Sequence, residues 1–266
     1  MAAAATRCLV LIPSYNTGGI LLETVRGARS AWAPVWVVID GSTDGSDVLL
    51  GMAMQDDPQF RLITLPANSG KGTAVLAGLR EAAAAGFTHA LVMDADGQHP
   101  ADAIGTFMAA AAAEPAALIL GRPVFGPEAP QLRVRGRRIS NWWANLETLG
   151  PGIGDSLFGF RVYPIAPLLQ VMQRCRWMRR FDFDPEAAVR LAWAGLPLIN
   201  LPAPVRYLRA EEGGVSHFSY GRDNILLTWM HIRLVFGMLA RLPMLIIRRV
   251  QRGPEVRTGP RLGTQP

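Results

Sequence analysis

The chain has 266 residues, of which 50% are hydrophobic and 18% are charged, and its formal net charge is +6. This length and composition suit one large domain with a sizeable core, and they exclude a small disulfide-stapled protein and a chain too polar to fold. Cys8 and Cys175 lie far apart in sequence, which favours a reducing compartment, and residues 1–7 lack the pattern of a signal peptide.

Apolar runs alternate with helix-like segments through the first half of the chain, which predicts parallel strands connected by helices. The expected strands are 9–13, 35–40, 60–65, 89–93 and 116–120, and the expected helices are 19–31, 46–54, 72–85 and 102–113. Residues 123–136 are rich in Pro, Gly and Arg, which predicts a loop. A helix over 139–149, a strand over 158–162 and a helix over 185–194 are expected to follow.

Prolines and composition divide the remainder of the chain. Pro202 and Pro204 limit residues 198–207 to an edge strand, because proline cannot donate a ladder hydrogen bond. We therefore expect an α/β domain over 1–210, a closing loop and amphipathic helix over 211–252, and a disordered basic tail over 253–266.

The expected helix over 225–247 is long enough to span a bilayer. However, His231 and Arg233 interrupt its apolar surface and Pro243 would kink it, and charges at the middle of a span are costly. We favour an interfacial helix with apolar side chains in lipid and arginines at headgroups. An ordinary amphipathic helix that closes the domain explains the pattern almost equally well.

The most informative motif follows the expected strand 89–93, where Asp94 and Asp96 are separated by one residue. Side chains alternate in an extended chain, so both carboxylates can face one cation. Carboxylate oxygens suit Mg²⁺ or Mn²⁺, which can neutralise a departing diphosphate. Taken alone, a helix cap and a solvated turn acid explain the pair as well.

Three other strand ends carry polar or flexible residues. Tyr15 could stack on a base or ribose, and Asp40 could accept hydrogen bonds from either, whereas Asp44 could equally cap the next helix. The glycine loop 68–73 can approach an anion at a helix N-terminus. Within that loop lies Lys71, the only lysine in the chain.

Two later segments offer further candidates. Asp182, Asp184 and Glu186 surround Pro185, and a sugar-hydroxyl acceptor would need one carboxylate as a general base, for which Asp184 is our candidate. A cap for the helix that begins near Pro185 is the structural alternative. The loop 211–220 carries His217, which could contact a metal or phosphate.

In chain order, these motifs resemble those of the family 2 inverting glycosyltransferases, and within them the dolichol- or polyprenol-phosphate sugar transferases. The motifs are PSYN at 13–16, DGSTD at 40–44, NSGKG at 68–72 and DADGQHP at 94–100. The resemblance covers roughly residues 8–210. It departs at Ile39 and Thr17, where members often carry acids, and at Asp184, where many carry Glu.

The resemblance implies a GT-A fold, with a Rossmann-like, mostly parallel sheet flanked by helices, that binds a nucleotide-diphosphate sugar. It implies nucleotide-side roles for Pro13, Tyr15, Asp40, Lys71 and Asp94, a metal site of Asp94, Asp96 and Gln98, and acceptor-phosphate roles for Arg122, Arg137, Ser140 and the stretch from Asp155. The expected activity is metal-dependent inverting transfer of a hexose to a lipid-phosphate or lipid-linked acceptor, at the cytoplasmic face of the inner membrane, with Mg²⁺ or Mn²⁺ as cofactor.

Two alternatives stay open from the sequence. A nucleotidyltransferase has a similar sheet and similar acids, and would release pyrophosphate. A non-catalytic membrane-surface module with a decayed transferase fold would explain the missing acid at Ile39. A nucleic-acid partner is not expected, because it would rest on the basic charge alone.

Overall fold

The computed structural model describes residues 5–126, 131–150, 152–206, 220–252 and 257–258. The strands are β1 (Cys8–Ser14), β2 (Val35–Asp40), β3 (Phe60–Leu65), β4 (His89–Val92), β5 (Leu118–Phe125), β6 (Arg161–Pro164), β7 (Leu198–Val205) and β8 (Arg257–Thr258). The helices are α1 (Ile20–Ala31), α2 (Ser46–Met54), α3 (Lys71–Ala84), the 3-10 turn η1 (Ala101–Ala103), α4 (Ile104–Ala113), α5 (Gln131–Glu147), α6 (Ile165–Arg174), α7 (Phe183–Ala194), α8 (Tyr220–Leu239) and α9 (Leu242–Arg252).

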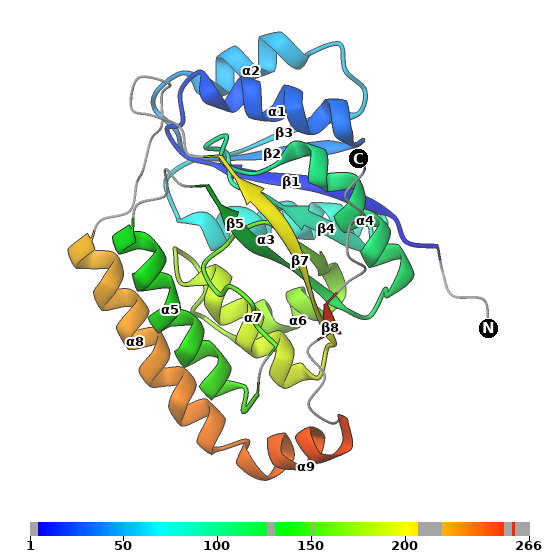
Figure 1. The fold of residues 1–266 in the computed structure, drawn as a ribbon. Coiled ribbons are helices and arrows are strands. Elements are labelled where there is room, and N and C mark those ends of the chain that lie inside the picture. Colours follow the sequence, from blue (N-terminus) through cyan, green and yellow to red (C-terminus); the bar gives the residue numbers. More distant parts are fainter. Residues whose placement is uncertain (1–4, 127–130, 151, 207–219, 253–256, 259–266) are drawn as a thin grey trace.

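The strands form one sheet in the order β3-β2-β1-β4-β6-β5-β7-β8 (Figure 1). Only β6 runs antiparallel to its two neighbours, β4 and β5. The other neighbouring pairs are parallel. The carboxyl ends of β1, β2 and β4 therefore meet at one edge of the sheet, where ligands of open α/β sheets bind.

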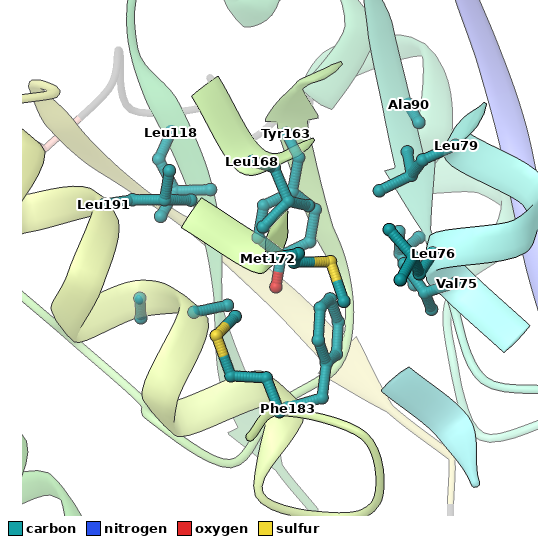
Figure 2. Packing of buried hydrophobic residues seen from close by; sticks show 14 of the residues in the cluster. Val75, Leu76, Leu79, Ala90, Leu118, Tyr163, Leu168, Met172, Phe183 and Leu191 are labelled. Carbon is teal, nitrogen blue, oxygen red and sulfur yellow. The ribbon is translucent and has the colours of Figure 1, made fainter. Parts of the chain in front are cut away.

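Helices cover both faces of the sheet. Because successive strand residues point to opposite sides, each strand contributes side chains to both cores. Leu9 and Leu11 of β1 pack with α3, α6, α7 and α8 on one face, while Val10 and Ile12 pack with α1, α2 and α4 on the other. Figure 2 shows the first of these cores, in which side chains of α3, α6 and α7 meet those of β4, β5 and β6. The fold is thus an α/β three-layer sandwich, and the predicted mostly parallel sheet is confirmed.

Gly78 shows how closely α3 lies on the sheet. A Cβ at this position would come within 2.5 Å of the Leu11 side chain and 3.0 Å of Val38. The absence of a side chain therefore lets the helix approach β1 and β2, and this approach fixes the N-terminus of α3 at the sheet edge.

Most predicted elements of the first half are found, and 35–40, 46–54 and 60–65 have the predicted bounds. The prediction of a loop over 123–136 was wrong at both ends, and residues 127–130 lie outside the described residues. β5 continues to Phe125 because it pairs residue for residue with β7, and α5 already begins at Gln131. The helix α6 was not predicted, although Leu168 and Met172 recur at helical spacing.

The prediction of an edge strand over 198–207 was only partly right. β7 lies between β5 and β8, but β8 pairs only with Ile199 and Asn200. Pro202 and Pro204 lie beyond that pairing and face β5 on one side only. They therefore occupy the positions of β7 where a missing N–H costs no bond to β8.

The expected long helix over 225–247 is two helices, α8 and α9, whose axes differ by 75°. The break precedes Pro243, which lies in the first turn of α9, where proline is tolerated. Within the described residues no single helix is long and apolar enough to cross a membrane, although the bent pair passes that test of length and composition together. Of the expected tail, the structure describes only residues 257–258, which form β8. The loop residue His217 also lies outside the described residues.

Candidate active site

A large cavity opens at the carboxyl edge of β1, β2 and β4, and its volume is about 1430 Å³. Ten of the twelve residues that the sequence assigned to a site line it: Pro13, Tyr15, Asp40, Lys71, Asp94, Asp96, Gln98, Arg137, Ser140 and Asp184. Arg122 and Asp155 do not line it. One end of the cavity is polar and lies over the strands, and the other lies between α5 and α8, which run side by side (Figure 1).

The loops that follow β1 and β2 are tied together at the polar end. The Thr43 amide donates to the Asn16 side chain at 2.8 Å, and the Asn16 amide donates to Ser42 Oγ at 3.0 Å. Asp44 accepts from the Gly18 amide at 2.8 Å and from the Ser46 amide at 3.1 Å. Asp44 therefore stabilises the start of α2 and the neighbouring loop. A structural role at the next helix is what the sequence allowed for this residue.

Asp40 holds the glycine loop in place. Its two carboxylate oxygens accept hydrogen bonds from the amides of Ser69 at 2.9 Å and Gly70 at 2.7 Å. Gly70 has a φ of 97°, a conformation that favours glycine, and a Cβ there would meet the backbone of Arg179 at 2.5 Å. These contacts fix Lys71 as the first residue of α3.

Lys71 bridges two carboxylates that are far apart in sequence. Its Nζ lies 2.5 Å from Asp94 Oδ1 and 2.5 Å from Asp184 Oδ2. The side chains of Lys71 and Asp184 are 13% and 8% exposed, and that of Asp94 is 32% exposed. Gly159 lies against this cluster, because a Cβ there would be 2.6 Å from Lys71 Nζ and 2.8 Å from Asp94 Oδ2.

The charges of the cluster stabilise one another. Burial raises the pKa of Asp94, but the nearby positive charges, first of all the Lys71 ammonium, together outweigh burial and lower it to about 2. The pKa of Lys71 is correspondingly raised, since the two carboxylates outweigh its own burial. At neutral pH Lys71 and Asp94 are therefore a charged pair.

His99 fixes the backbone and side chain of Asp94. The Asp94 amide donates to His99 Nδ1 at 2.9 Å, so the proton of the neutral ring lies on Nε2, which is 3.5 Å from Asp94 Oδ2. Burial lowers the pKa of His99 despite the nearby carboxylates. The ring also packs edge to face on Phe158, with a centroid distance of 4.7 Å. His99 is therefore a neutral residue that orients Asp94.

The chemistry of the pair Asp94 and Asp96 suits a hard divalent cation. Burial, and next the charge of Asp94, raise the pKa of Asp96, so a cation between the carboxylates would relieve their repulsion. No group of three or more His, Cys, Asp or Glu side chains among the described residues could hold a metal alone. Mg²⁺ in proteins is commonly held by one or two carboxylates together with substrate phosphates and water. The donor set thus fits a metal that binds together with a diphosphate.

The three acids near Pro185 have different surroundings. Asp182 accepts hydrogen bonds from the backbone amides of Met178 at 3.1 Å and Arg180 at 3.0 Å, so it shapes the loop before α7. Glu186 is fully buried and paired with Arg190 and Arg233. Asp184 faces the cavity, and its Oδ1 is buried without a hydrogen-bond partner among the described residues.

Arg137 and Ser140 lie one turn apart on α5 and line the cavity, and the charge of Arg137 is close enough to Asp94 to help lower its pKa. Asp155 is buried behind Arg137, whose guanidinium donates to it at 2.8 Å, so Asp155 orients the arginine from outside the cavity. Arg122 is exposed on β5 and packs near Gly154. Arg122 therefore lies outside the lining of the cavity that contains Arg137 and Ser140.

Sequence reasoning missed several residues of the cavity wall. Arg180 and Phe181 come from the loop before α7, and Trp143, His231 and Phe236 come from α5 and α8. The arginine-rich run 174–180 was the only signal for the first group. The second group depends on the packing of α5 against α8, which no local pattern specifies.

Comparisons with known proteins give a matching family and similar proteins. The family described as "Glycosyl transferase family 2" matches residues 9–179. A polyprenol monophosphomannose synthase of Mycolicibacterium smegmatis (strain ATCC 700084 / mc(2)155) is 30% identical over 219 residues, which are 80% of this chain and 81% of that protein.

Solved structures are similar in fold. A Staphylococcus aureus TarS fragment in complex with UDP-GlcNAc has a TM-score of 0.55 and 15% identity, over 93% of this chain and 74% of that one. Glucosyl-3-phosphoglycerate synthase from Mycobacterium tuberculosis, in complex with Mn²⁺, UDP-glucose and phosphoglyceric acid, has a TM-score of 0.55 and 17% identity, over 89% of this chain and 79% of that one.

Proposed function

Because this chain belongs to glycosyl transferase family 2, we propose that it transfers a sugar, with inversion, from a nucleotide-diphosphate donor to a lipid-phosphate or lipid-linked acceptor. The observation that carries the proposal is one cavity with two different ends. The Lys71, Asp94 and Asp96 cluster lies on the strand side, and Arg137 and Ser140 lie on the α5 side. The activity named for the M. smegmatis relative supports a polyprenol-type phosphate as the acceptor class.

The donor binds at the strand edge in this proposal. Pro13, Tyr15 and Asp40 line the nucleotide side, and the Asp40 carboxylate keeps the glycine loop in shape. Asp94 and Asp96, with Gln98 beside them, would hold Mg²⁺ or Mn²⁺. When bound, the ion neutralises charge on the departing diphosphate.

Lys71 adds a fixed positive charge at the same place. Its ammonium is already oriented by Asp94 and Asp184, so no reorganisation is needed as negative charge develops on the leaving group. Asp184 thus has a positioning role toward Lys71. If the acceptor is a sugar hydroxyl, Asp184 is also the candidate general base.

A phosphate acceptor needs no strong base, because its oxygen is already ionised. That oxygen attacks the anomeric carbon while the bond to the nucleoside diphosphate breaks. Arg137 attracts the acceptor phosphate, and Asp155 keeps the guanidinium in place from behind.

The apolar surface beside this end supports binding at a membrane surface, which we place on the inner face. Ile139 and Trp142 of α5 are 65% and 59% exposed, and Ile225 and Trp229 of α8 are 72% and 49% exposed. Large exposed apolar patches mark interaction sites, and tryptophan suits the headgroup region. A lipid acceptor held there would reach the cavity through its apolar end.

The test is product analysis. The protein is incubated with a panel of nucleotide sugars, Mn²⁺ and farnesyl monophosphate in detergent, and the products are identified by mass spectrometry and NMR. We expect a farnesyl phosphosugar of inverted anomeric configuration together with a nucleoside diphosphate. Release of pyrophosphate would instead select a nucleotidyltransferase, and absence of any donor binding would select a non-catalytic module.

A further inference from the structure

A second buried polar cluster lies in the cavity wall, between α5 and α8. His231 Nδ1 is 2.7 Å from Glu147 Oε1, and His231 Nε2 is 3.4 Å from Ser140 Oγ. Ser140 and His231 line the cavity, whereas Glu147 is fully buried behind them. The donor end uses none of these residues.

Hydrogen-bond directions show where the protons of this cluster lie. The Ser156 amide donates to Asn141 Oδ1 at 2.7 Å, so that oxygen is an acceptor, and the Ser156 hydroxyl also donates to it at 2.9 Å. Ser156 Oγ therefore accepts the hydroxyl proton of Ser140 at 3.0 Å. Since Ser140 has used its proton, it can only accept from His231, and Nε2 of His231 must carry a proton.

A second proton lies between His231 and Glu147. With Nε2 protonated, the 2.7 Å contact is either a carboxylic acid donating to Nδ1 or an imidazolium donating to a carboxylate. Burial, which outweighs the hydrogen bond to His231, raises the pKa of Glu147 and favours the carboxylic acid. Glu147 Oε2 is buried without a hydrogen-bond partner among the described residues, whereas most buried polar atoms in proteins have one.

We propose that His231 is an anion-binding residue at the acceptor end of the cavity. Its Nε2–H exchanges the 3.4 Å contact with Ser140 for a hydrogen bond to the acceptor's phosphate, which the Arg137 guanidinium also binds. The inference rests on the proposed function and adds a residue to its acceptor site. As the anion binds, the Oε1–H bond of Glu147 breaks and the Nδ1–H bond of His231 forms. The pair keeps two protons and zero net charge, but positive charge moves toward the phosphate.

The charges around the dyad are mixed, and Arg135 and Arg180 also line the cavity. Lys71 is held by Asp94 and Asp184 at the donor end. The other ionic contacts near the dyad are Arg137 with Asp155, and Arg233 and Arg190 with Glu186. Asp223, at the start of α8, also lines the cavity. Most of these charges are paired within the protein, so a histidine that becomes cationic when an anion binds would add positive charge beside Arg137.

The experiment compares His231→Asn with His231→Gln as a matched pair. Asparagine retains a nitrogen near the position of Nδ1 and loses the group at Nε2, whereas glutamine retains a neutral donor near Nε2. With farnesyl monophosphate as acceptor, we expect the KM of His231→Asn to rise about tenfold or more, from the loss of one hydrogen bond to a charged group. His231→Gln and Glu147→Gln should show smaller rises.

Controls separate binding of the anion from damage to the fold. In all three variants kcat and the donor KM should stay near wild type, and so should inhibition by farnesol, which lacks the phosphate. Inorganic phosphate should compete with farnesyl monophosphate less well in His231→Asn than in wild type. The free energy of unfolding in urea is measured for each variant.

An unchanged acceptor KM in a folded His231→Asn variant would overturn the inference, while activity of the wild type with farnesyl monophosphate would leave the proposed function intact. Wild-type protein labelled with ¹⁵N-histidine gives an answer even if the variants do not fold. Farnesyl monophosphate should move one imidazole to the imidazolium chemical shift, and the absence of any such change would equally overturn it.

Discussion

Replacing Lys71 by methionine tests the charge cluster at the donor end most sharply. The substitution keeps the volume of the side chain but leaves Asp94 and Asp184 facing each other without a cation. Breaking a buried ion pair costs about 3–5 kcal/mol. Because the Asp94 side chain is 32% exposed, solvent reduces this, and we expect the free energy of unfolding to fall by about 2–3 kcal/mol at pH 7.

The pH dependence of the free energy of unfolding should distinguish the variant from the wild type. In the wild type the pKa of Asp94 is lowered to about 2, so its stabilisation is present at pH 7 and is lost only as the pH falls below about 4. In Lys71→Met the buried carboxylates lack a cation, so the folded state binds protons more readily than the unfolded chain. As the pH is lowered from 7 to 5, the stability of the variant should therefore increase relative to that of the wild type, in which Asp96 and Glu147 already have raised pKa values.

Urea unfolding followed by circular dichroism at pH 5, 6 and 7 measures both effects. Arg61→Met is a matched control, because Arg61 and Glu81 form an exposed ion pair, and it should change stability by less than about 1 kcal/mol without altering the pH slope. The double variant Lys71→Met/Asp184→Asn should recover part of the loss. The reasoning is refuted if Lys71→Met is as stable as the wild type at pH 7, or if its stability has the wild-type pH slope.

Three further predictions concern the site and the surface. Asp96→Ala should abolish both transfer and the Mn²⁺-dependent rise in melting temperature on adding a nucleotide sugar; a full rise would argue against a metal role for this acid. Gly159→Ala should lower kcat while the protein stays folded, because its Cβ would come within 2.6 Å of Lys71 Nζ; unchanged kcat would show that the cluster tolerates displacement. Ile225→Ser/Trp229→Ser should weaken binding to anionic vesicles in flotation assays and spare transfer to a detergent-solubilised acceptor, whereas equal vesicle binding would remove α8 from the membrane contact.

Local patterns were enough to predict the strand ends that build the donor side. The apolar runs before Asp40 and Asp94 are short and bounded by turn residues, so both acids could be placed at the carboxyl edge of the sheet. Likewise, the glycine loop predicted a helix from residue 72, and α3 begins one residue earlier, at Lys71. Each of these predictions depends on neighbouring residues in the chain.

Contacts between distant segments could not be predicted in this way. Lys71 and Asp184 lie 113 residues apart, and their pairing depends on the packing of α7 beside α3. The position of Arg122 outside the cavity depends on how far β5 continues along β7. The Pro, Gly and Arg content of this segment predicted a loop from residue 123 instead. The dyad of His231 and Glu147 requires α8 to lie on α5, and a lone histidine in an apolar helix gives no sign of such a partner.

Manganese binding followed by electron paramagnetic resonance tests the central claim most directly. Asp94 and Asp96 supply only part of a coordination shell, so the account predicts weak Mn²⁺ binding by the protein alone and much tighter binding when a nucleoside diphosphate is added. Asp94→Asn/Asp96→Asn should lose this enhancement. Equal Mn²⁺ affinity with and without the diphosphate, or an enhancement that survives in the double variant, would contradict the account.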